Sequence, residues 1–266
     1  MKKIKKYIDY ALVQLKRKLN EKKYNSQDAT LKYLFYQCEN SDKMVVVFSA
    51  CTRVGIPARY NYVRTLDGEN INRLYILDDE GTDKRGSFYL GSYPEYKTEK
   101  AVLGLINTII DKYNICDLYF AGSSKGGWAA LNIAASMDRT VKAIVIGAPQ
   151  YYLGNYLKAP ANVTSFDFVK GSGKEEDVVE ELNNHLKNKI KSISNTEIFL
   201  HYSEYEHTYN DHIISLLEDL KKFSVVINED KKEYTNHQDV SLYFPQYLKD
   251  TIALLINREA EHNVSK

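Results

Sequence analysis

The sequence is poor in the features that mark secreted, membrane-spanning and zinc-binding proteins. Its 266 residues include only three cysteines, Cys38, Cys51 and Cys116, an odd number without metal-ligand spacing. Neither a disulfide framework nor a zinc site is therefore expected, and reduced thiols favour a cytoplasmic protein. No run approaches the roughly 18 apolar residues that a membrane span requires. The N-terminus also lacks the apolar core and the small-residue cleavage site of a signal peptide.

The chain has almost no excess of either charge, except at its N-terminus. The formal net charge is +1, which gives no reason to expect nucleic acid as a partner. Residues 1–23 nevertheless hold nine Lys/Arg against two acids, and their apolar residues recur at helical spacing. Two interpretations stay open: a helix docked on the domain with a solvated lysine face, or a helix lying on the anionic inner face of a membrane. The sequence carries no signal for an oligomeric state.

The order of expected elements indicates an α/β fold. Two helical segments (1–23 and about 27–38) come first, and strands then alternate with helices. Short apolar runs without polar alternation are typical of strands buried on both faces of a parallel sheet. We therefore expect a mostly parallel sheet with helices on both faces. The expected strands are 44–50, 59–64, 73–77, 87–90, 116–122, 141–149, 196–202 and 223–228, and the later helices are 98–113, 125–137, 209–222 and 239–257.

These elements predict one large domain with additions. A helical N-terminal extension over residues 1–40 precedes the α/β domain at 41–258. The less regular, charged segment at about 150–195 is expected to form a cap, and residues 259–266 a polar tail.

The stretch FAGSSKGGWAALNIAA, residues 120–135, carries the most specific signal. Gly122 to Gly126 matches G-x-S-x-G, with an expected strand before it and a helix after it. Such a turn holds the central Ser124 in a strained conformation, exposes its Oγ and points the N–H groups of the helix at the site. No window here supplies the G-x-x-x-x-G-K-[ST] of a phosphate-binding loop. Ser123 is the second candidate nucleophile, although it falls one position early.

An activated serine needs a base and an acid, which in this architecture follow in the order Ser, Asp/Glu, His. His237 lies in the loop between the last expected strand and the last helix, so it is the expected base. The acid is expected after strand 196–202, where a small residue is commonly followed three positions later by a carboxylate. Ser203 and Glu206 fit this spacing, and Glu204 remains an alternative acid.

Other site residues follow from the same architecture. The backbone N–H of Lys125 and that of Cys51, or alternatively Ala50, are expected to form an oxyanion hole. The histidines at 201, 207 and 212 have no metal-ligand spacing, so no metal is expected. Aromatic residues of the cap either stack on sugar rings or pack in the core. They are Tyr151, Tyr152, Tyr156, Phe166 and Phe168, of which Tyr151 and Tyr152 are the expected substrate-binding residues.

Five stretches resemble known families: VVVFSA, RYNYVRTL, RLYILDDEG, RGSFYLG and FAGSSKGGWAALNIA. Over roughly residues 44–258 the chain resembles the α/β hydrolases, and more specifically bacterial XcbB/CpsF-type capsular polysaccharide biosynthesis proteins. It also resembles the α/β-hydrolase-like second accessory protein of the accessory Sec export system, which is associated with O-acetylation of serine-rich surface glycoproteins. The resemblance implies an acyl-transfer site at Ser124, Glu206 and His237 in surface-glycan production.

The expected function is therefore that of a serine esterase, deacetylase or O-acyltransferase acting on a glycan or glycan precursor. This chemistry needs no metal or organic cofactor, although an acyltransferase needs a donor such as acetyl-CoA. The alternative is a non-catalytic protein of the same fold that binds or assembles partners in surface glycan or glycoprotein production.

Overall fold

The computed structural model describes residues 19–193 and 195–264. The expected basic helix at residues 1–23 lies mostly outside these ranges.

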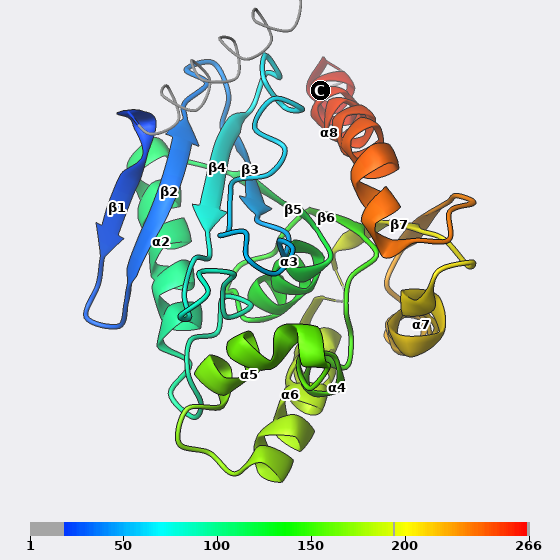
Figure 1. The fold of residues 1–266 in the computed structure, drawn as a ribbon. Helices are drawn as coiled ribbons and strands as arrows, with labels where there is room; N and C mark the ends of the chain where they lie inside the picture. The colour runs from blue at the N-terminus through cyan, green and yellow to red at the C-terminus, as the bar shows by residue number, and fades with distance from the viewer. Residues whose placement is uncertain (1–18, 194, 265–266) are drawn as a thin grey trace, which may run out of the picture.

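One eight-stranded sheet organises the chain, in the order β1-β2-β4-β3-β5-β6-β7-β8 (Figure 1). The pairs β1–β2 and β2–β4 are antiparallel, and all other pairs are parallel. The expected α/β class with a mostly parallel sheet is confirmed. The strands are β1 (Lys22–Asn25), β2 (Thr30–Tyr36), β3 (Lys43–Phe48), β4 (Asn72–Leu77), β5 (Asp117–Ser123), β6 (Ala143–Gly147), β7 (Glu197–Tyr202) and β8 (Ile227–Lys231).

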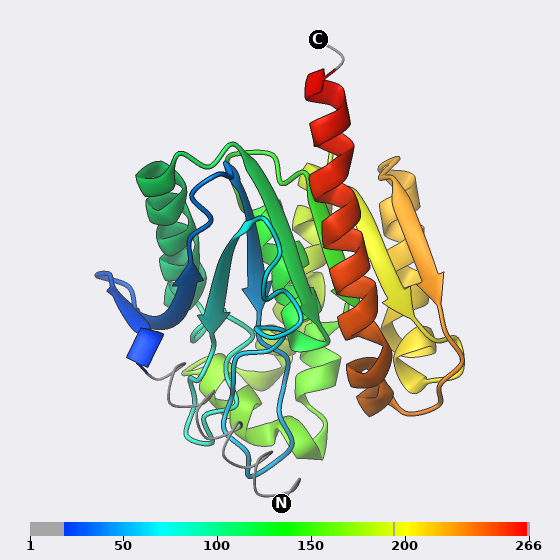
Figure 2. The same cartoon turned by 90° about the horizontal axis from the view of Figure 1, so that it is seen from above.

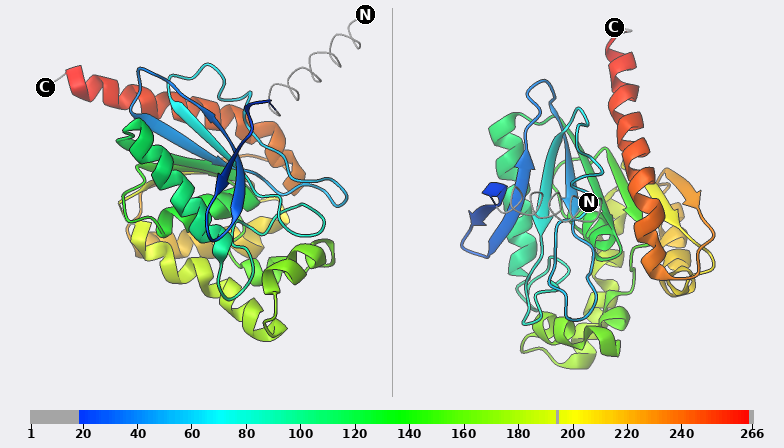
Figure 3. Two further views of the ribbon diagram at one scale, coloured as in Figure 1. Left: turned by 90° about the vertical axis from the view of Figure 1, so that its left-hand side faces the viewer. Right: turned by 45° about the horizontal axis from the view of Figure 1, so that its top comes forward.

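Helices cover both faces of this sheet, as Figure 3 shows for α8 on one side and α2 on the other. Alternate strand residues face a larger core beneath α2, α3, α6 and α7 and a smaller one beneath α8. Figure 2 shows α8 lying over the sheet with its axis roughly along the strands, and the helix contacts β5, β6 and β7. Among the described residues, no helix is long and apolar enough to span a bilayer. The helices are α2 (Lys97–Tyr113), α3 (Lys125–Ala135), α4 (Leu153–Leu157), α5 (Val163–Lys170), α6 (Glu175–Lys189), α7 (Ile214–Lys222) and α8 (Val240–Val264).

Several expected elements are wrong. The helix expected at 27–38 is strand β2, because its side chains enter both cores and its backbone pairs with β1 and β4. The N-terminal extension is therefore not helical over these residues. The segments 59–64 and 87–90 are turns rather than strands, since Tyr62, Phe88 and Tyr89 have φ values of 59°, 58° and 60°. The last strand lies later than expected, at Ile227–Lys231.

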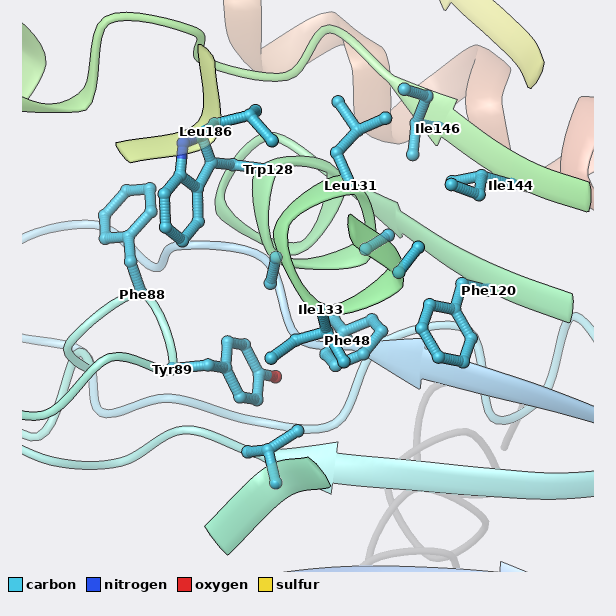
Figure 4. Packing of buried hydrophobic residues seen from close by; sticks show 14 of the residues in the cluster. Phe48, Phe88, Tyr89, Phe120, Trp128, Leu131, Ile133, Ile144, Ile146 and Leu186 are labelled. Carbon is cyan, nitrogen blue, oxygen red and sulfur yellow. The ribbon is translucent and has the colours of Figure 1, made fainter. Parts of the chain in front are cut away.

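Helix α3 is the central element of the larger core. Its residues from Lys125 to Ala134 are all buried. Figure 4 shows the side chains of Trp128, Leu131 and Ile133, which extend from α3 and pack among side chains of the neighbouring strands and of α6. At Gly126 the helix approaches β3 so closely that a Cβ would lie 2.4 Å from the carbonyl oxygen of Phe48. A side chain at this position would therefore push α3 off the sheet.

A buried charged cluster ties α6 to α2. His185 lies between two carboxylates, with Nε2 3.3 Å from Glu99 and Nδ1 2.8 Å from Glu181. Lys189 Nζ donates to Glu99 at 2.6 Å. Burial lowers the pKa of His185, and so does the charge of Lys189, whose Nζ lies 2.9 Å from Nε2. The hydrogen bonds to Glu181 and Glu99 outweigh both effects, so the pKa is raised. Burial raises the pKa of Glu99, but the bonds to His185 and Lys189 reverse this and bring it to about 2.

The raised pKa of His185 predicts a pH-dependent contribution to stability. The charged ring stabilises the fold fully below its unfolded pKa, and this contribution is lost as the pH rises through the folded pKa. Replacing His185 by Gln is expected to lower the unfolding free energy by about 1–3 kcal/mol near pH 5.5, and by less near pH 8.5. Thermal unfolding across this range measures the difference. In the control Asn183→Ala, an effect that is independent of pH is expected, because Asn183 lies on the same helix and the amide that it loses, which pairs with Asn155, does not titrate. A constant difference for His185→Gln would contradict the assignment.

Candidate active site

The turn between β5 and α3 holds Ser124 in an unusual backbone conformation. Its φ is 52° and its ψ −120°, although it is not a glycine. The Ser124 N–H donates to the carbonyl oxygen of Gly147 on the neighbouring strand at 2.8 Å. A Cβ on Gly122 would lie 2.4 Å from the backbone of Gly126, so the turn requires glycine at this point. The G-x-S-x-G sequence thus forms a tight strand-to-helix turn.

Ser124, His237 and Glu206 lie in one chain of hydrogen-bond distances. Ser124 Oγ is 2.9 Å from His237 Nε2, and His237 Nδ1 is 3.2 and 3.3 Å from the two carboxylate oxygens of Glu206. The three residues follow β5, β8 and β7, respectively. These strands are parallel, so their carboxyl ends bring residues 31 and 113 positions apart to one edge of the sheet.

Glu206 is a buried carboxylate held in its charged form. Its side chain accepts from the N–H and the hydroxyl of Thr208, and His207 Nδ1 lies 3.3 Å away. Burial raises the pKa of Glu206, but the hydrogen bond from His237 outweighs burial and the pKa is lowered. The alternative acid, Glu204, instead forms a surface ion pair with Lys231 at 2.9 Å.

The charge on Glu206 decides the roles of the two histidine nitrogens. An ionised carboxylate only accepts hydrogen bonds, so His237 donates from Nδ1. Its Nε2 is then an acceptor, and the Ser124 hydroxyl donates to it. The arrangement can therefore remove the hydroxyl proton of Ser124 when Oγ attacks an electrophile.

Backbone donors lie beside the nucleophile position. Lys125 is the first residue of α3, and an N–H in the first turn of a helix has no partner within that helix. Of the two alternatives expected in the loop after β3, the N–H of Ala50 already donates to Asn61 Oδ1 at 2.9 Å. The N–H of Cys51 is the one that we retain as a candidate for the oxyanion hole.

The side chain of Lys125 has a role that the sequence did not reveal. It is fully buried, and its Nζ donates to the Asp78 carboxylate at 3.0 Å and to the carbonyl oxygen of Arg85 at 2.8 Å. The Arg85 guanidinium in turn donates to the carbonyl oxygens of Thr52 at 2.9 Å and Ala161 at 2.7 Å. This network connects the turn at Ser124 with the loop after β3 and with the segment between α4 and α5.

A second group that contacts Ser124 was also missed. The Gln150 side chain is fully buried, and its Nε2 donates to Ser124 Oγ at 3.0 Å. Gln150 lies three residues beyond the end of β6, outside any motif. Its position just past the end of a parallel strand was the only signal that could have found it.

A partly aromatic cleft of about 290 Å³ that also carries polar groups is lined by Tyr152, Asn155, Tyr156, Ala159, His207, Asp211 and His212. His207 also lines an adjoining depression with His237, and the two rings meet edge to face at 5.7 Å. Burial lowers the pKa of His212 to about 4, so this ring is neutral at neutral pH, and its Nδ1 accepts from the N–H of Tyr152.

Only one of the two tyrosines that are expected to bind substrate lines this cleft. Tyr152 lines it, so its assignment to substrate binding stays a prediction. Tyr151 is fully buried and its hydroxyl donates to Asp219, so the prediction for this residue is wrong. The tyrosine is held in the core because its ring packs there while Asp219 satisfies its polar end. Within the described ranges, no group of three or more His, Cys, Asp or Glu is placed to hold a metal ion.

Comparison with known proteins identifies the family. Residues 68–250 match the family described as accessory Sec system GspB-transporter. The chain belongs to this accessory Sec family. No curated protein matches its sequence.

Solved structures share the fold of this accessory Sec family protein at low sequence identity. The capsule O-acetyltransferase of Neisseria meningitidis serogroup A is 21% identical, with a TM-score of 0.72 over 87% of this chain and 93% of that one. The glycosylation-associated Gap123 complex from Streptococcus agalactiae is 19% identical, with a TM-score of 0.72 over 90% of this chain and 46% of that one. The fluorophosphonate-binding serine hydrolase FphF from Staphylococcus aureus is 13% identical, with a TM-score of 0.60 over 89% and 97%. These likenesses establish the α/β-hydrolase fold.

The two acidic candidates make different predictions. Glu206→Gln is expected to slow the reaction of Ser124 with a fluorophosphonate by about 10²- to 10⁴-fold, because His237 loses the partner that fixes its tautomer. Glu204→Gln is the matched control and is expected to react at nearly the rate of the unaltered protein. Labelling rates of the two purified variants check this. A slow Glu204→Gln beside a normal Glu206→Gln would move the acid by two residues.

Proposed function

We propose that this accessory Sec family protein is a serine acyl-transfer enzyme that acts on an ester of a surface glycan or glycan precursor. The observation that carries the proposal is the continuous chain from the buried carboxylate of Glu206 through His237 to Ser124 Oγ. The strained turn, the helix N-terminus behind it and the adjoining cleft add to its support.

The geometry supports a two-step reaction. Ser124 Oγ attacks the acyl carbon while its proton passes to His237 Nε2, and the carbonyl electron pair moves to the oxygen. The N–H groups of Lys125 and Cys51 stabilise that oxyanion. The intermediate collapses as His237 returns the proton to the leaving group, which leaves an acyl ester on Ser124. A hydroxyl group or water then attacks the ester, giving up its proton to His237, and Ser124 is released.

The description of a similar structure and the side chains of the cleft both support a carbohydrate substrate. A capsule O-acetyltransferase covers nearly the whole of this fold, and one of its variants has been solved with CoA. The cleft combines tyrosine rings with amide, carboxylate and imidazole groups. Rings that cover the apolar faces of a sugar and polar groups that bind its hydroxyls suit this substrate class. We accordingly propose that a sugar hydroxyl carries the acyl group: it is the leaving group when a glycan ester is cleaved, and the acceptor when the acyl group comes from a separate donor.

The Gap123 complex favours a second candidate function. The Gap123 chain is more than twice as long as its part that matches the present fold, and the description of that structure names a complex. A protein of the accessory Sec family could therefore bind protein partners and use the fold for assembly without chemistry, because fold does not imply function.

Labelling of the serine separates the two functions. Ser124→Ala is expected to abolish labelling by a fluorophosphonate and hydrolysis of p-nitrophenyl acetate, because it removes the attacking oxygen. Ser123→Ala is the control, since Ser123 Oγ is hydrogen-bonded to the Tyr62 hydroxyl and its loss is expected to leave labelling intact. Mass spectrometry of the labelled peptide locates the adduct. An unlabelled natural protein that still binds partners would favour the assembly function.

A further inference from the structure

Gln150 contacts the reacting oxygen, yet the reaction described above does not use it. Its Nε2 donates to Ser124 Oγ at 3.0 Å from a fully buried position. Its Oε1 is also buried and has no hydrogen-bond partner among the described residues. An unpaired buried acceptor destabilises a fold, so such groups are uncommon and call for a reason.

The hydrogen-bond chain decides which end of the amide faces the serine. Ser124 has a single hydroxyl proton, and that proton is donated to His237 Nε2. A lone pair of Oγ therefore remains for Gln150, which must donate through Nε2. The opposite orientation of the amide would place two acceptors, Oγ and Oε1, against each other. The unsatisfied end is thus the amide oxygen, and the satisfied end is the donor on the nucleophile.

We propose that Gln150 is a further catalytic residue, whose N–H orients Ser124 Oγ and stabilises the charge that develops on it. This inference rests on the proposed acyl transfer. During acylation the Oγ–H bond breaks, its proton passes to His237, and an Oγ lone pair forms the bond to the acyl carbon. The N–H of Gln150 stabilises the partial negative charge that Oγ carries between the loss of its proton and the completion of the bond to carbon, and the net charge then lies on the carbonyl oxygen.

The same N–H acts again when the acyl group leaves. The bond from Oγ to the acyl carbon breaks, the bonding pair returns to Oγ, and His237 delivers a proton to it. Gln150 stabilises the oxygen until that proton arrives. Two hydrogen bonds, from Gln150 and to His237, also restrict rotation of the Ser124 side chain and keep Oγ aligned with the imidazole.

A purely structural Gln150 would behave differently on substitution. An apolar side chain of similar size removes the unsatisfied Oε1, so the stability of the fold is expected to stay equal or rise. The same change removes the donor to Oγ, so reactivity is expected to fall. Opposite effects on stability and on rate are therefore the signature of the proposed role.

The test uses Gln150→Met and Gln150→Leu, two apolar side chains of different shape. Both are expected to react about tenfold or more slowly with a fluorophosphonate and with p-nitrophenyl acetate, as when one hydrogen bond to a reacting atom is lost. Their melting temperatures are expected to equal or exceed that of the natural protein. Gln246→Met is the matched control, because this glutamine is exposed on α8 and pairs with Asp250.

Three results would overturn the inference. A folded Gln150 variant that reacts at the natural rate shows that the donor is dispensable. A melting temperature that falls in both variants, or a failure of both to fold, assigns Gln150 a structural role. Absence of labelling at Ser124 in the natural protein overturns the proposed function itself, and the inference with it. That last result is recognisable because it involves no Gln150 variant.

Discussion

The backbone of Ser124 is the constraint on which the rest of the site depends. A positive φ at a residue other than glycine costs about 1–3 kcal/mol and persists only where the surroundings enforce it. Here the N–H of Ser124 is bonded to the next strand, and α3 begins immediately after the turn. The absence of side chains at Gly122 and Gly126 lets α3 descend onto β3 and β5. The packing of the core therefore fixes the position of Oγ.

A buried ion pair extends this constraint to the loops around the site. The side chains of Lys125 and Asp78 form an ion pair, and both are inaccessible to solvent. Moving Lys125 would therefore leave the buried carboxylate of Asp78 without its opposite charge. Room for the pair exists only because Gly86 lacks a Cβ, which would lie 2.3 Å from both partners. Lys125 also holds the carbonyl oxygen of Arg85, whose side chain binds the loop that carries Cys51. The turn and the loop after β3 thus belong to one polar network.

Sequence patterns predicted the parts of this molecule that local chemistry dictates. The strand–turn–helix around Ser124 and the parallel sheet follow from short apolar runs, glycine spacing and helical periodicity. Segment 30–36 was assigned incorrectly, because pairing with β4 overrides its local pattern. Gln150 and the side chain of Lys125 could not be predicted, since their partners lie 26 and 47 residues away and only the closed sheet brings them together.

Fold similarity at 21% identity or less leaves the functional argument to the site. Residues from four separate segments, Ser124, Gln150, Glu206 and His237, converge on one hydroxyl oxygen and on the imidazole that accepts its proton. Three of them are buried, and burying polar groups lowers the stability of the fold unless each is paired. The hydrophobic cores on the two faces of the sheet offset that cost, and none of the four residues belongs to either core. Acyl transfer requires a serine hydroxyl aligned with an imidazole, and this alignment is the feature of the site on which the proposed function rests.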